Sequence, residues 1–289
     1  MKSALIINPA SARLGNTRKV ERIKQKLSRM GLAAACFLTS RPGEASILAR
    51  KAVESGAGVI LAAGGDGTLN EVINGMAESS ASLGIIPTGV SNVLALELGI
   101  PINVDEALAV IIKGHTRKID LGLINDRYFS LMAGIGFDAR SVKMVNPVLK
   151  RYLKRYAYHL SGLKSMISAA LPPFKISLNG DREETVYAAV ISNARFYGGS
   201  HQINPRARLD DGRLHCCLFR KGKRRDYLRY FSGVLRKRHH TYSDVEITEI
   251  QSAQILTPSI PVQIDGDYFG DTPVRIEIRP GLFKLISPA

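Results

Sequence analysis

Residues 58–76 read GVILAAGGDGTLNEVINGM and combine three kinds of local sequence in a short space. The run from Gly58 to Ala63 has the length and the continuous hydrophobicity of a buried strand. A glycine-rich turn follows at once, and Leu69 to Met76 has the spacing of a helix. The stretch therefore predicts a strand, a tight turn and a helix in direct succession.

Strand-like and helix-like segments alternate in the same way through the first 120 residues. Further strands are expected at Ala4–Asn8, Leu32–Thr39 and Leu83–Pro87, and helices at Thr17–Met30, Glu44–Ser55, Ser91–Leu98 and Val104–Lys113. This order is typical of an α/β layer with a mainly parallel sheet. Ligands of such sheets bind beyond the carboxyl ends of the strands.

The second half of the chain has a different texture, because short alternating runs replace the strand–helix alternation. Antiparallel strands are expected at Tyr128–Met132, Phe174–Leu178, Val186–Ser192, Leu214–Phe219, Gln254–Leu256, Val262–Ile264 and Val274–Arg279. Helical spacing interrupts them at Pro147–Ala170 and near Asp226–Leu235. The predicted fold is an N-terminal α/β domain followed by an antiparallel β-sandwich.

Length and composition agree with two domains and indicate a polyanionic partner. The chain has 289 residues, a hydrophobic content of 45% and a formal net charge of +15. Such a charge favours nucleic acid, phosphorylated substrates or acidic lipid, and by itself does not choose among them. Its three cysteines indicate neither a disulfide framework nor a zinc site, and its six histidines are expected at the surface.

No targeting segment is expected. The first apolar run ends at Ile7 and is followed by Pro9, which is too short for a signal peptide. The longest uncharged stretch, Ser79 to Leu96, contains polar residues and glycines and fits a strand, a turn and a helix start better than a membrane span. The sequence predicts a cytoplasmic protein.

The turn Gly64-Gly65-Asp66-Gly67-Thr68 has the chemistry of a phosphate cradle. Glycines let backbone amides approach a phosphate, and the helix that follows presents unpaired N–H groups and the positive end of its dipole. Asp66 suits a Mg²⁺ bound to that phosphate. Composition alone equally allows a tight turn in which Asp66 caps Leu69 or Asn70.

GGDGTLNEVINGM (64–76) resembles the signature of the diacylglycerol kinase catalytic domain, which bacterial lipid kinases, sphingosine kinases and ceramide kinases share. Further segments match that family in its order: Asn8–Ser11, Thr39–Ala45, Ile119–Gly122, Gly134–Ala139, Asn204–Ala207, Asp211–Leu214 and Gln263–Asp267. NAD kinases also carry GGDGT, but not this ordered series. The resemblance therefore spans essentially the whole chain.

The resemblance implies a two-domain kinase that binds ATP between its halves. Residues 1–118, completed by 281–289, would form the nucleotide domain, and residues 119–280 the lipid-substrate domain. The implied nucleotide-site residues are Asn8, Thr39, Gly64, Gly65, Asp66, Gly67, Thr68, Leu69, Asn70, Glu71, Val90, Ser91 and Asn92. Many relatives have Gly-Thr-x-Asn-Asp where this chain has Gly89-Val90-Ser91-Asn92-Val93, so a hydroxyl and a carboxylate are missing. Ser91 is expected to supply a hydroxyl and to cap the next helix.

Asp265 and Asp267 are the candidate catalytic acids beside Asp66. The family position of the proton acceptor matches Asp267 and is often Glu in relatives. On a strand, Asp265 and Asp267 would face the same side. The alternative for Asp265-Gly266-Asp267 is a hairpin turn without chemistry.

A structural Mg²⁺ is implied in the loop around Asp210-Asp211-Gly212. Its ligands would be the Asp211 carboxylate and the main-chain carbonyls of Arg208 and Arg213, a set of oxygens that suits a hard cation. The alternative is a type I′ hairpin turn.

Basic residues gather at Arg13–Arg29, Lys143–Lys164 and Arg220–Arg238, the last two with interleaved aromatic residues. Such helices suit an anionic membrane surface, whereas each cluster taken alone fits a solvated face. No nucleic-acid motif accompanies the charge, so no nucleic-acid partner is expected.

The sequence thus predicts an ATP- and Mg-dependent lipid kinase of phospholipid biosynthesis, bound peripherally to anionic lipid. Diacylglycerol or a related glycerolipid is the expected acceptor, and a homodimer is left open. The alternatives are an NAD kinase and a catalytically weak membrane-binding regulatory protein, the latter because of Val90 and Val93.

Overall fold

The structure, a computed structural model, describes residues 2–14, 17–143 and 172–289. The chain divides into an N-terminal unit, Met1–Ile119 with Gly281–Ala289, and a C-terminal unit, Asp120–Pro280. The helix expected at Pro147–Ala170, and all of the Lys143–Lys164 basic cluster except Lys143, lie outside the described residues. Among the described residues, no helix has the length and hydrophobicity needed to cross a membrane.

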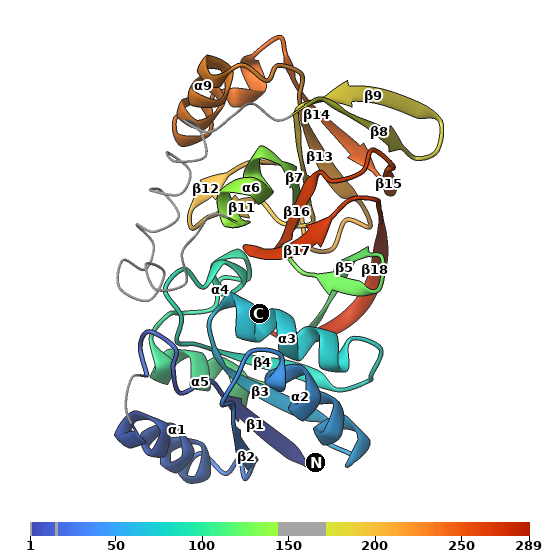
Figure 1. The fold of residues 1–289 in the computed structure, drawn as a ribbon. Coiled ribbons are helices and arrows are strands. Elements are labelled where there is room, and N and C mark those ends of the chain that lie inside the picture. The colour runs from blue at the N-terminus through green and yellow to red at the C-terminus, as the bar shows by residue number, and fades with distance from the viewer. Residues whose placement is uncertain (1, 15–16, 144–171) are drawn as a thin grey trace. The chain divides into compact units, whose positions relative to one another are not determined.

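The N-terminal unit is built on a parallel sheet, which confirms the α/β prediction (Figure 1). Its strands follow the order β2 (Ala35–Leu38), β1 (Ser3–Ile7), β3 (Val59–Gly64) and β4 (Ser82–Pro87), and the end of β18 (Val274–Ile286) pairs with β4 in parallel. The helices are α1 (Thr17–Arg29), α2 (Glu44–Glu54), α3 (Asp66–Met76), α4 (Val93–Glu97) and α5 (Val104–Lys113).

Packing in this unit follows from small and apolar residues at the expected positions. Val20, Ile23 and Leu27 give α1 one buried face, which joins the core with residues of β1, β3 and α5. Gly75 lets α3 approach α2 closely, since a Cβ at that position would lie 2.3 Å from the Ser46 carbonyl oxygen. The N-cap Asn103 accepts two backbone N–H groups, so α5 begins where the sequence predicts.

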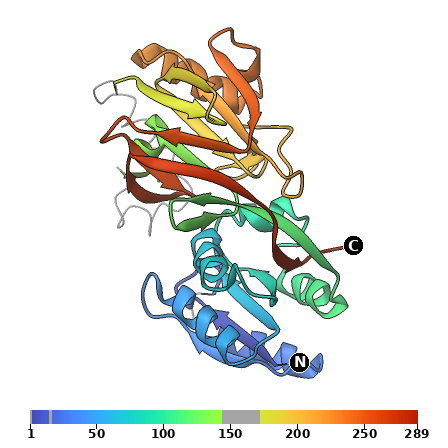
Figure 2. The same ribbon diagram turned by 90° about the vertical axis from the view of Figure 1, so that its right-hand side faces the viewer.

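The C-terminal unit is an antiparallel β-sandwich, as predicted (Figure 2). One sheet has the order β14 (Val245–Ile250), β13 (Leu214–Phe219), β10 (Ala188–Ser192), β7 (Met132–Gly136), β16 (Pro261–Ile264) and β17 (Asp267–Asp271). The other contains β9 (Arg182–Val186), β8 (Phe174–Leu178), β15 (Ser252–Ile255) and the first part of β18. Their facing side chains form one apolar core that includes Phe129, Phe174 and Ile276.

Shorter elements complete this unit. They are β5 (Thr116–Ile124), which begins in the N-terminal unit, β6 (Arg127–Phe129), β11 (Phe196–Tyr197), β12 (His201–Gln202), α6 (Phe137–Lys143), α9 (Arg224–Leu235) and a 3₁₀ turn at His239–Thr241. The strand expected at Tyr128–Met132 is wrong, because the chain turns between β6 and β7 at Ser130 and Leu131. The surface placement of the histidines is wrong for His215 and His239, which are buried.

Four charged residues link the two sheets of the sandwich at one edge. Arg182 of β9 donates two hydrogen bonds to Glu246 of β14, at 2.8 and 2.9 Å, and also contacts Glu184 at 2.6 Å. Arg220 contacts both carboxylates. Mainly through the hydrogen bonds from Arg182, and further through those from Arg220, the pKa of Glu246 is lowered to about 2.

This lowered pKa predicts a pH-dependent contribution to stability. Glu246 stabilises the fold fully above its unfolded pKa of about 4.5, and the contribution is lost as the pH falls towards 2. We expect the parent to lose about 1–2 kcal/mol more unfolding free energy between pH 6 and pH 3 than Glu246→Gln, allowing for solvent screening. Urea unfolding at both pH values measures this. Equal losses of unfolding free energy in the parent and in Glu246→Gln would contradict this prediction. Glu183→Gln changes an exposed neighbour and is the control, so it should lose as much as the parent. A smaller loss in Glu183→Gln, like that expected of Glu246→Gln, would also contradict the prediction.

Candidate active site

The glycine-rich turn lies at the carboxyl end of β3 and runs straight into α3. The helix begins at Asp66, three residues before the predicted start, because Gly67 and Thr68 already belong to its first turn. The Leu69 amide closes that turn on the Gly65 carbonyl at 3.0 Å. The first amides of a helix have no partner within it, so this turn has the backbone donors and the dipole that an anion requires.

A second glycine turn packs directly against the first. A Cβ on Gly89 would lie 2.4 Å from the Cα of Gly65, so Gly89 has no room for a side chain, and a Cβ on Gly65 would lie 3.2 Å from the Cα of Gly89, which is a tight fit. Asn92 holds the second turn closed, since its side chain accepts the Gly89 N–H at 2.9 Å and donates to the Gly89 carbonyl at 3.1 Å. Asn92 itself has a left-handed backbone with φ 47°. The two turns therefore form one compact backbone surface.

Polar side chains tie the end of β1 to both turns. The Asn8 side-chain amide donates to the Thr68 hydroxyl at 3.0 Å, and its side-chain oxygen Oδ1 accepts the Ala10 N–H at 3.0 Å. Ser11 and Thr88 share a hydrogen bond of 2.8 Å between their hydroxyls. The structure thus brings Asn8, Thr68 and the Gly89 turn together at the carboxyl ends of three adjacent parallel strands, where α/β proteins bind ligands.

Asp66 connects the first turn of its own helix to the start of the next one. Its Oδ1 atom accepts the backbone N–H of Leu94, at 3.2 Å, in the first turn of α4. The alternative in which it caps Leu69 or Asn70 stays a prediction beside this contact. The expectation that Ser91 caps α4 is wrong, since Asn92 occupies the N-cap position and makes no side-chain cap.

The remaining predicted nucleotide residues divide into supporting and exposed ones. Glu71 accepts the N–H groups of Gly43 and Ala45 with its two oxygens, at 2.8 and 3.1 Å, and so fixes the start of α2 just after Thr39. The side chains of Leu69 and Asn70 are buried in the unit, whereas Val90 is 42% exposed. Glu71 therefore holds the start of α2 and Leu69 packs in the core, and neither side chain extends into the surface formed by the glycine turns.

In the C-terminal unit, Asp265 and Gly266 form the turn of the β16–β17 hairpin. Both have positive φ, 48° and 87°, as a type I′ turn requires, and Ile264 pairs with Asp267. The interpretation that Asp265 and Asp267 face the same side of a strand is wrong, because the chain makes a hairpin turn there. The catalytic role of Asp267 stays a prediction. Asp267 is half-buried at the first position of β17.

The Asp265 carboxylate anchors this hairpin to the start of β7. Its Oδ1 accepts the N–H groups of Leu131 and Met132 at 2.9 and 3.0 Å, and its Oδ2 accepts the N–H and the hydroxyl of Ser130 at 2.9 and 3.0 Å. Four donors to one carboxylate make a strong, charge-assisted attachment. Asp265 is thus a residue that positions the turn beside Asp267.

Gln263 and Asp138 also support the hairpin, and the sequence reasoning missed the roles of both. Gln263 accepts the Gly266 N–H at 2.8 Å and donates to Asp138 at 2.8 Å, and Tyr197 donates to the other oxygen of Asp138. Burial raises the pKa of the Asp138 carboxyl, and these two hydrogen bonds act against that rise. Both residues lie inside matched segments, Gly134–Ala139 and Gln263–Asp267, which was the available signal.

The loop around Asp211 is held by hydrogen bonds between its own residues and the strands. Gly212 donates to Asp120 at 2.6 Å, Arg213 N–H donates to Oδ1 of Asp211 at 3.1 Å, and His215 lies 2.9 Å from Oδ2. Only Gly212 of the Asp211-Gly212 pair has positive φ, so the type I′ alternative is wrong. A cation here would have to share both oxygens of Asp211.

Metal binding by side chains alone has little support within the described residues. No group of three or more His, Cys, Asp or Glu side chains there has the geometry of a metal site. A phosphate-bound Mg²⁺ needs only one or two carboxylates besides the phosphates, which Asp66 fits. The Mg²⁺ predicted at Arg208, Asp211 and Arg213 stays a prediction.

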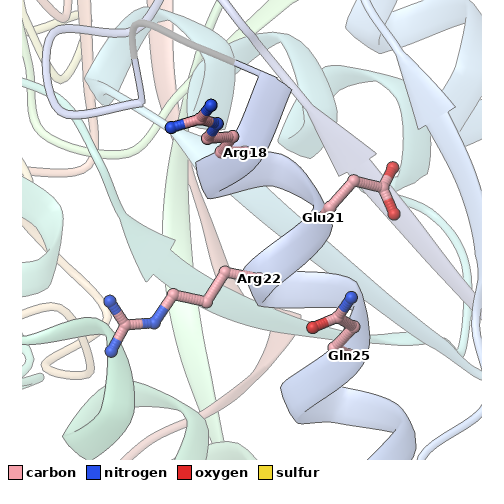
Figure 3. Close-up of a pocket in the computed structure, with 4 residues that line it drawn as sticks. All are labelled: Arg18, Glu21, Arg22 and Gln25. Carbon is pink, nitrogen blue, oxygen red and sulfur yellow. The ribbon is translucent and has the colours of Figure 1, made fainter.

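A shallow depression on the surface of α1 is separate from these residues. It is lined by Arg18, Glu21, Arg22 and Gln25 (Figure 3). The two arginines extend to one side of the helix and Glu21 to the other. It contains no predicted nucleotide residue and belongs to the Arg13–Arg29 basic cluster.

Comparison with known proteins matches each of the two units of the chain to a protein family. The family described as "Diacylglycerol kinase catalytic domain" matches residues 2–124, and the "YegS C-terminal NAD kinase beta sandwich-like domain" matches residues 132–287. A diacylglycerol kinase of Bacillus subtilis (strain 168) is 30% identical over 94% of this chain and 92% of its own length. One of Staphylococcus carnosus (strain TM300) is 28% identical over 95% and 91%.

Solved structures show the same fold. The crystal structure of a diacylglycerol kinase from Bacillus anthracis str. Sterne superposes with a TM-score of 0.79 at 26% identity, covering 99% of this chain and 97% of that one. Another structure from the same organism reaches a TM-score of 0.84, also at 26% identity, covering 99% and 95%. The chain therefore belongs to the diacylglycerol kinase catalytic-domain family and is a lipid kinase with a YegS-type C-terminal β-sandwich.

Proposed function

We propose that this lipid kinase transfers the γ-phosphate of Mg·ATP to a hydroxyl of diacylglycerol or a related glycerolipid. The acceptor oxygen attacks the γ-phosphorus, the bond from that phosphorus to the β,γ-bridging oxygen breaks, and ADP leaves. The observation that carries the proposal is the paired glycine turn that runs into the N-terminus of α3 with Asp66 in its first turn. The activity named for the bacterial relatives supports the acceptor class.

The nucleotide part of the proposal belongs to residues 1–118 and 281–289. The amides of the Gly64–Thr68 turn bind phosphate oxygens, and the contact between Gly65 and Gly89 keeps side chains away from them. A bound Mg²⁺ would neutralise phosphate charge, with Asp66 as its protein ligand. Asn8 keeps Thr68 oriented, and Glu71 keeps the segment after Thr39 in place.

The acceptor part belongs to residues 119–280. Asp267 takes the proton of the attacking hydroxyl, while Asp265 and Gln263 hold the hairpin that carries it. The acceptor is a membrane lipid and the donor is ATP, so the proposal places the enzyme on the cytoplasmic surface of a membrane. Its place is in phospholipid metabolism, between a reaction that releases a glycerolipid alcohol and one that uses the phosphorylated lipid.

Transfer of labelled γ-phosphate from ATP into mixed micelles tests this proposal. The full chain is incubated with and without Mg²⁺ and with diacylglycerol, monoacylglycerol, a sphingoid base or NAD⁺, and the products are extracted and separated. We expect Mg²⁺-dependent label in the glycerolipid. Label in the sphingoid base would change the acceptor, label in NADP⁺ would replace the proposal with an NAD kinase, and no label in any product would favour a regulatory membrane-binding protein.

A further inference from the structure

Helix α9 of the C-terminal unit has one face fixed firmly against the β-sandwich. Tyr227 stacks on Phe137 with ring centroids 4.2 Å apart, and Tyr230 packs on Phe219 at 4.8 Å. The Tyr230 hydroxyl also donates to Asp244 at 2.7 Å. Both tyrosines are buried, so the orientation of α9 on the unit is well defined.

The opposite face of α9 presents an apolar stripe to solvent. Leu228, Phe231 and Leu235 are spaced three and four residues apart and therefore lie along one side of the helix. Their exposed fractions are 50%, 40% and 42%. Three large apolar side chains aligned in this way make a continuous patch rather than scattered exposed residues.

Basic residues surround this apolar stripe at both ends of the helix. Lys221, Lys223, Arg224, Arg225, Arg236, Lys237 and Arg238 are all exposed. The Lys221 side chain approaches Asp244 at 3.9 Å, and the side chains of the other six form no ion pair with an acid among the described residues. The acid of α9, Asp226, is buried and accepts the Lys223 N–H at 3.0 Å, so no negative charge of the helix reaches this surface.

We propose that the stripe Leu228, Phe231 and Leu235 inserts into the surface of an anionic lipid bilayer, with α9 lying parallel to that surface. This inference rests on the proposed lipid kinase function, which requires the enzyme to meet a membrane. Apolar side chains on one face and flanking Lys and Arg are the two features by which an interfacial helix binds acidic lipid.

Charge complementarity selects the bilayer over other occupants. Two copies of this face would bring the same basic residues together, and like charges in an interface oppose association. Nucleic acid would pair with the basic residues and leave the apolar stripe in water. An anionic bilayer satisfies both, since its headgroups pair with the charges and its acyl region receives the stripe.

The first test compares vesicle binding of the full chain and a triple variant, Leu228→Ser/Phe231→Ser/Leu235→Ser. The vesicles are phosphatidylcholine with or without phosphatidylglycerol, and bound protein is separated by flotation. We expect the variant to bind phosphatidylglycerol vesicles about tenfold more weakly or worse. The matched control, Ile47→Ser/Leu256→Ser, removes exposed apolar side chains elsewhere, at 49% and 66%, and is expected to bind like the parent. Parent-like binding by the triple variant would overturn the proposal.

The second test places a reporter in the stripe, because the chain contains no tryptophan. Phe231→Trp is expected to shift its emission to the blue and to be quenched by brominated acyl chains in phosphatidylglycerol vesicles. Leu256→Trp, on the loop before β16, is expected to do neither. Unchanged emission of Phe231→Trp in the presence of bound vesicles means that another surface binds and contradicts insertion.

A third measurement separates this inference from the kinase proposal. Phosphorylation of a short-chain diacylglycerol below its micelle concentration needs no membrane, so the triple variant is expected to keep the parent's kcat on it. No activity in either protein, together with loss of vesicle binding only in the triple variant, would sink the kinase proposal and keep the membrane face. A lower oligomeric mass of the triple variant in light scattering would instead assign the stripe to a second copy and overturn the inference.

Discussion

Replacing Asp66 with asparagine is expected to lower kcat by about a hundredfold to a thousandfold while the protein stays folded. The amide keeps the size of the side chain and an oxygen for the Leu94 N–H, which lies 3.2 Å from Oδ1 in the parent. It loses the negative charge that a phosphate-bound Mg²⁺ requires. Steady-state kinetics at several Mg²⁺ concentrations, with thermal unfolding of both proteins, measure the two effects separately.

Asp66→Ala provides the comparison, because it removes the charge and the contact with α4 together. We expect the same loss of kcat and, in addition, a loss of about 1 kcal/mol of unfolding free energy for the lost helix cap. If Asp66→Asn keeps the parent kcat at saturating Mg²⁺ while Asp66→Ala does not, Asp66 acts through α4 and has no part in metal binding.

The N-terminal unit could be predicted closely because its signals are local. The helix Val104–Lys113 lies between Asn103, whose side chain caps it, and Gly114, whose φ of 69° ends it. The apolar run before Gly64 is long enough to be a strand wherever it sits in a sheet. Each such element can be identified without knowledge of its neighbours.

The β-sandwich could be predicted only in outline, because its strands depend on distant partners. Strand β14 carries Glu246, Thr248 and Glu249, and it becomes a strand by pairing with β13. Its alternation is blurred by these polar side chains, so propensity alone does not find it. The break at Ser130 was missed for the same reason, since the side chain that fixes it belongs to Asp265.

The candidate site shows the same division between local and distant information. The phosphate-cradle turn could be predicted from its glycines, because their effect on the backbone is local. The partners of its acids could not: Leu94 lies 28 residues after Asp66, and Leu131 lies 134 residues before Asp265. Sequence spacing grouped Asp265 with Asp267 as candidate catalytic acids, whereas its contacts show that the Asp265 carboxylate anchors the hairpin. A catalytic role is thus proposed for Asp267 and not for Asp265.

Asp267→Asn is expected to lower kcat, whereas Asp265→Asn is expected to lower the free energy of unfolding. Asp267→Asn removes the proposed proton acceptor, so kcat should fall about a hundredfold to ten-thousandfold with an unchanged thermal melt. Asp265→Asn replaces one accepting carboxylate oxygen with an amide NH2 group, which is itself a donor and would face the N–H groups of Ser130 or of Leu131 and Met132. Unfolding free energy should fall by about 2–3 kcal/mol.

The conservative variant Asp267→Glu decides whether the carboxylate itself matters. A glutamate keeps the carboxylate base on a longer side chain, so Asp267→Glu should recover most of the activity that Asp267→Asn loses. If residue 267 only shapes the hairpin, the larger glutamate should lower kcat as much as the asparagine does. Kinetics with monomeric short-chain diacylglycerol keep membrane binding out of the comparison. Equal kcat in Asp267→Asn and the parent would remove Asp267 from the reaction and leave proton acceptance to solvent or to another acid.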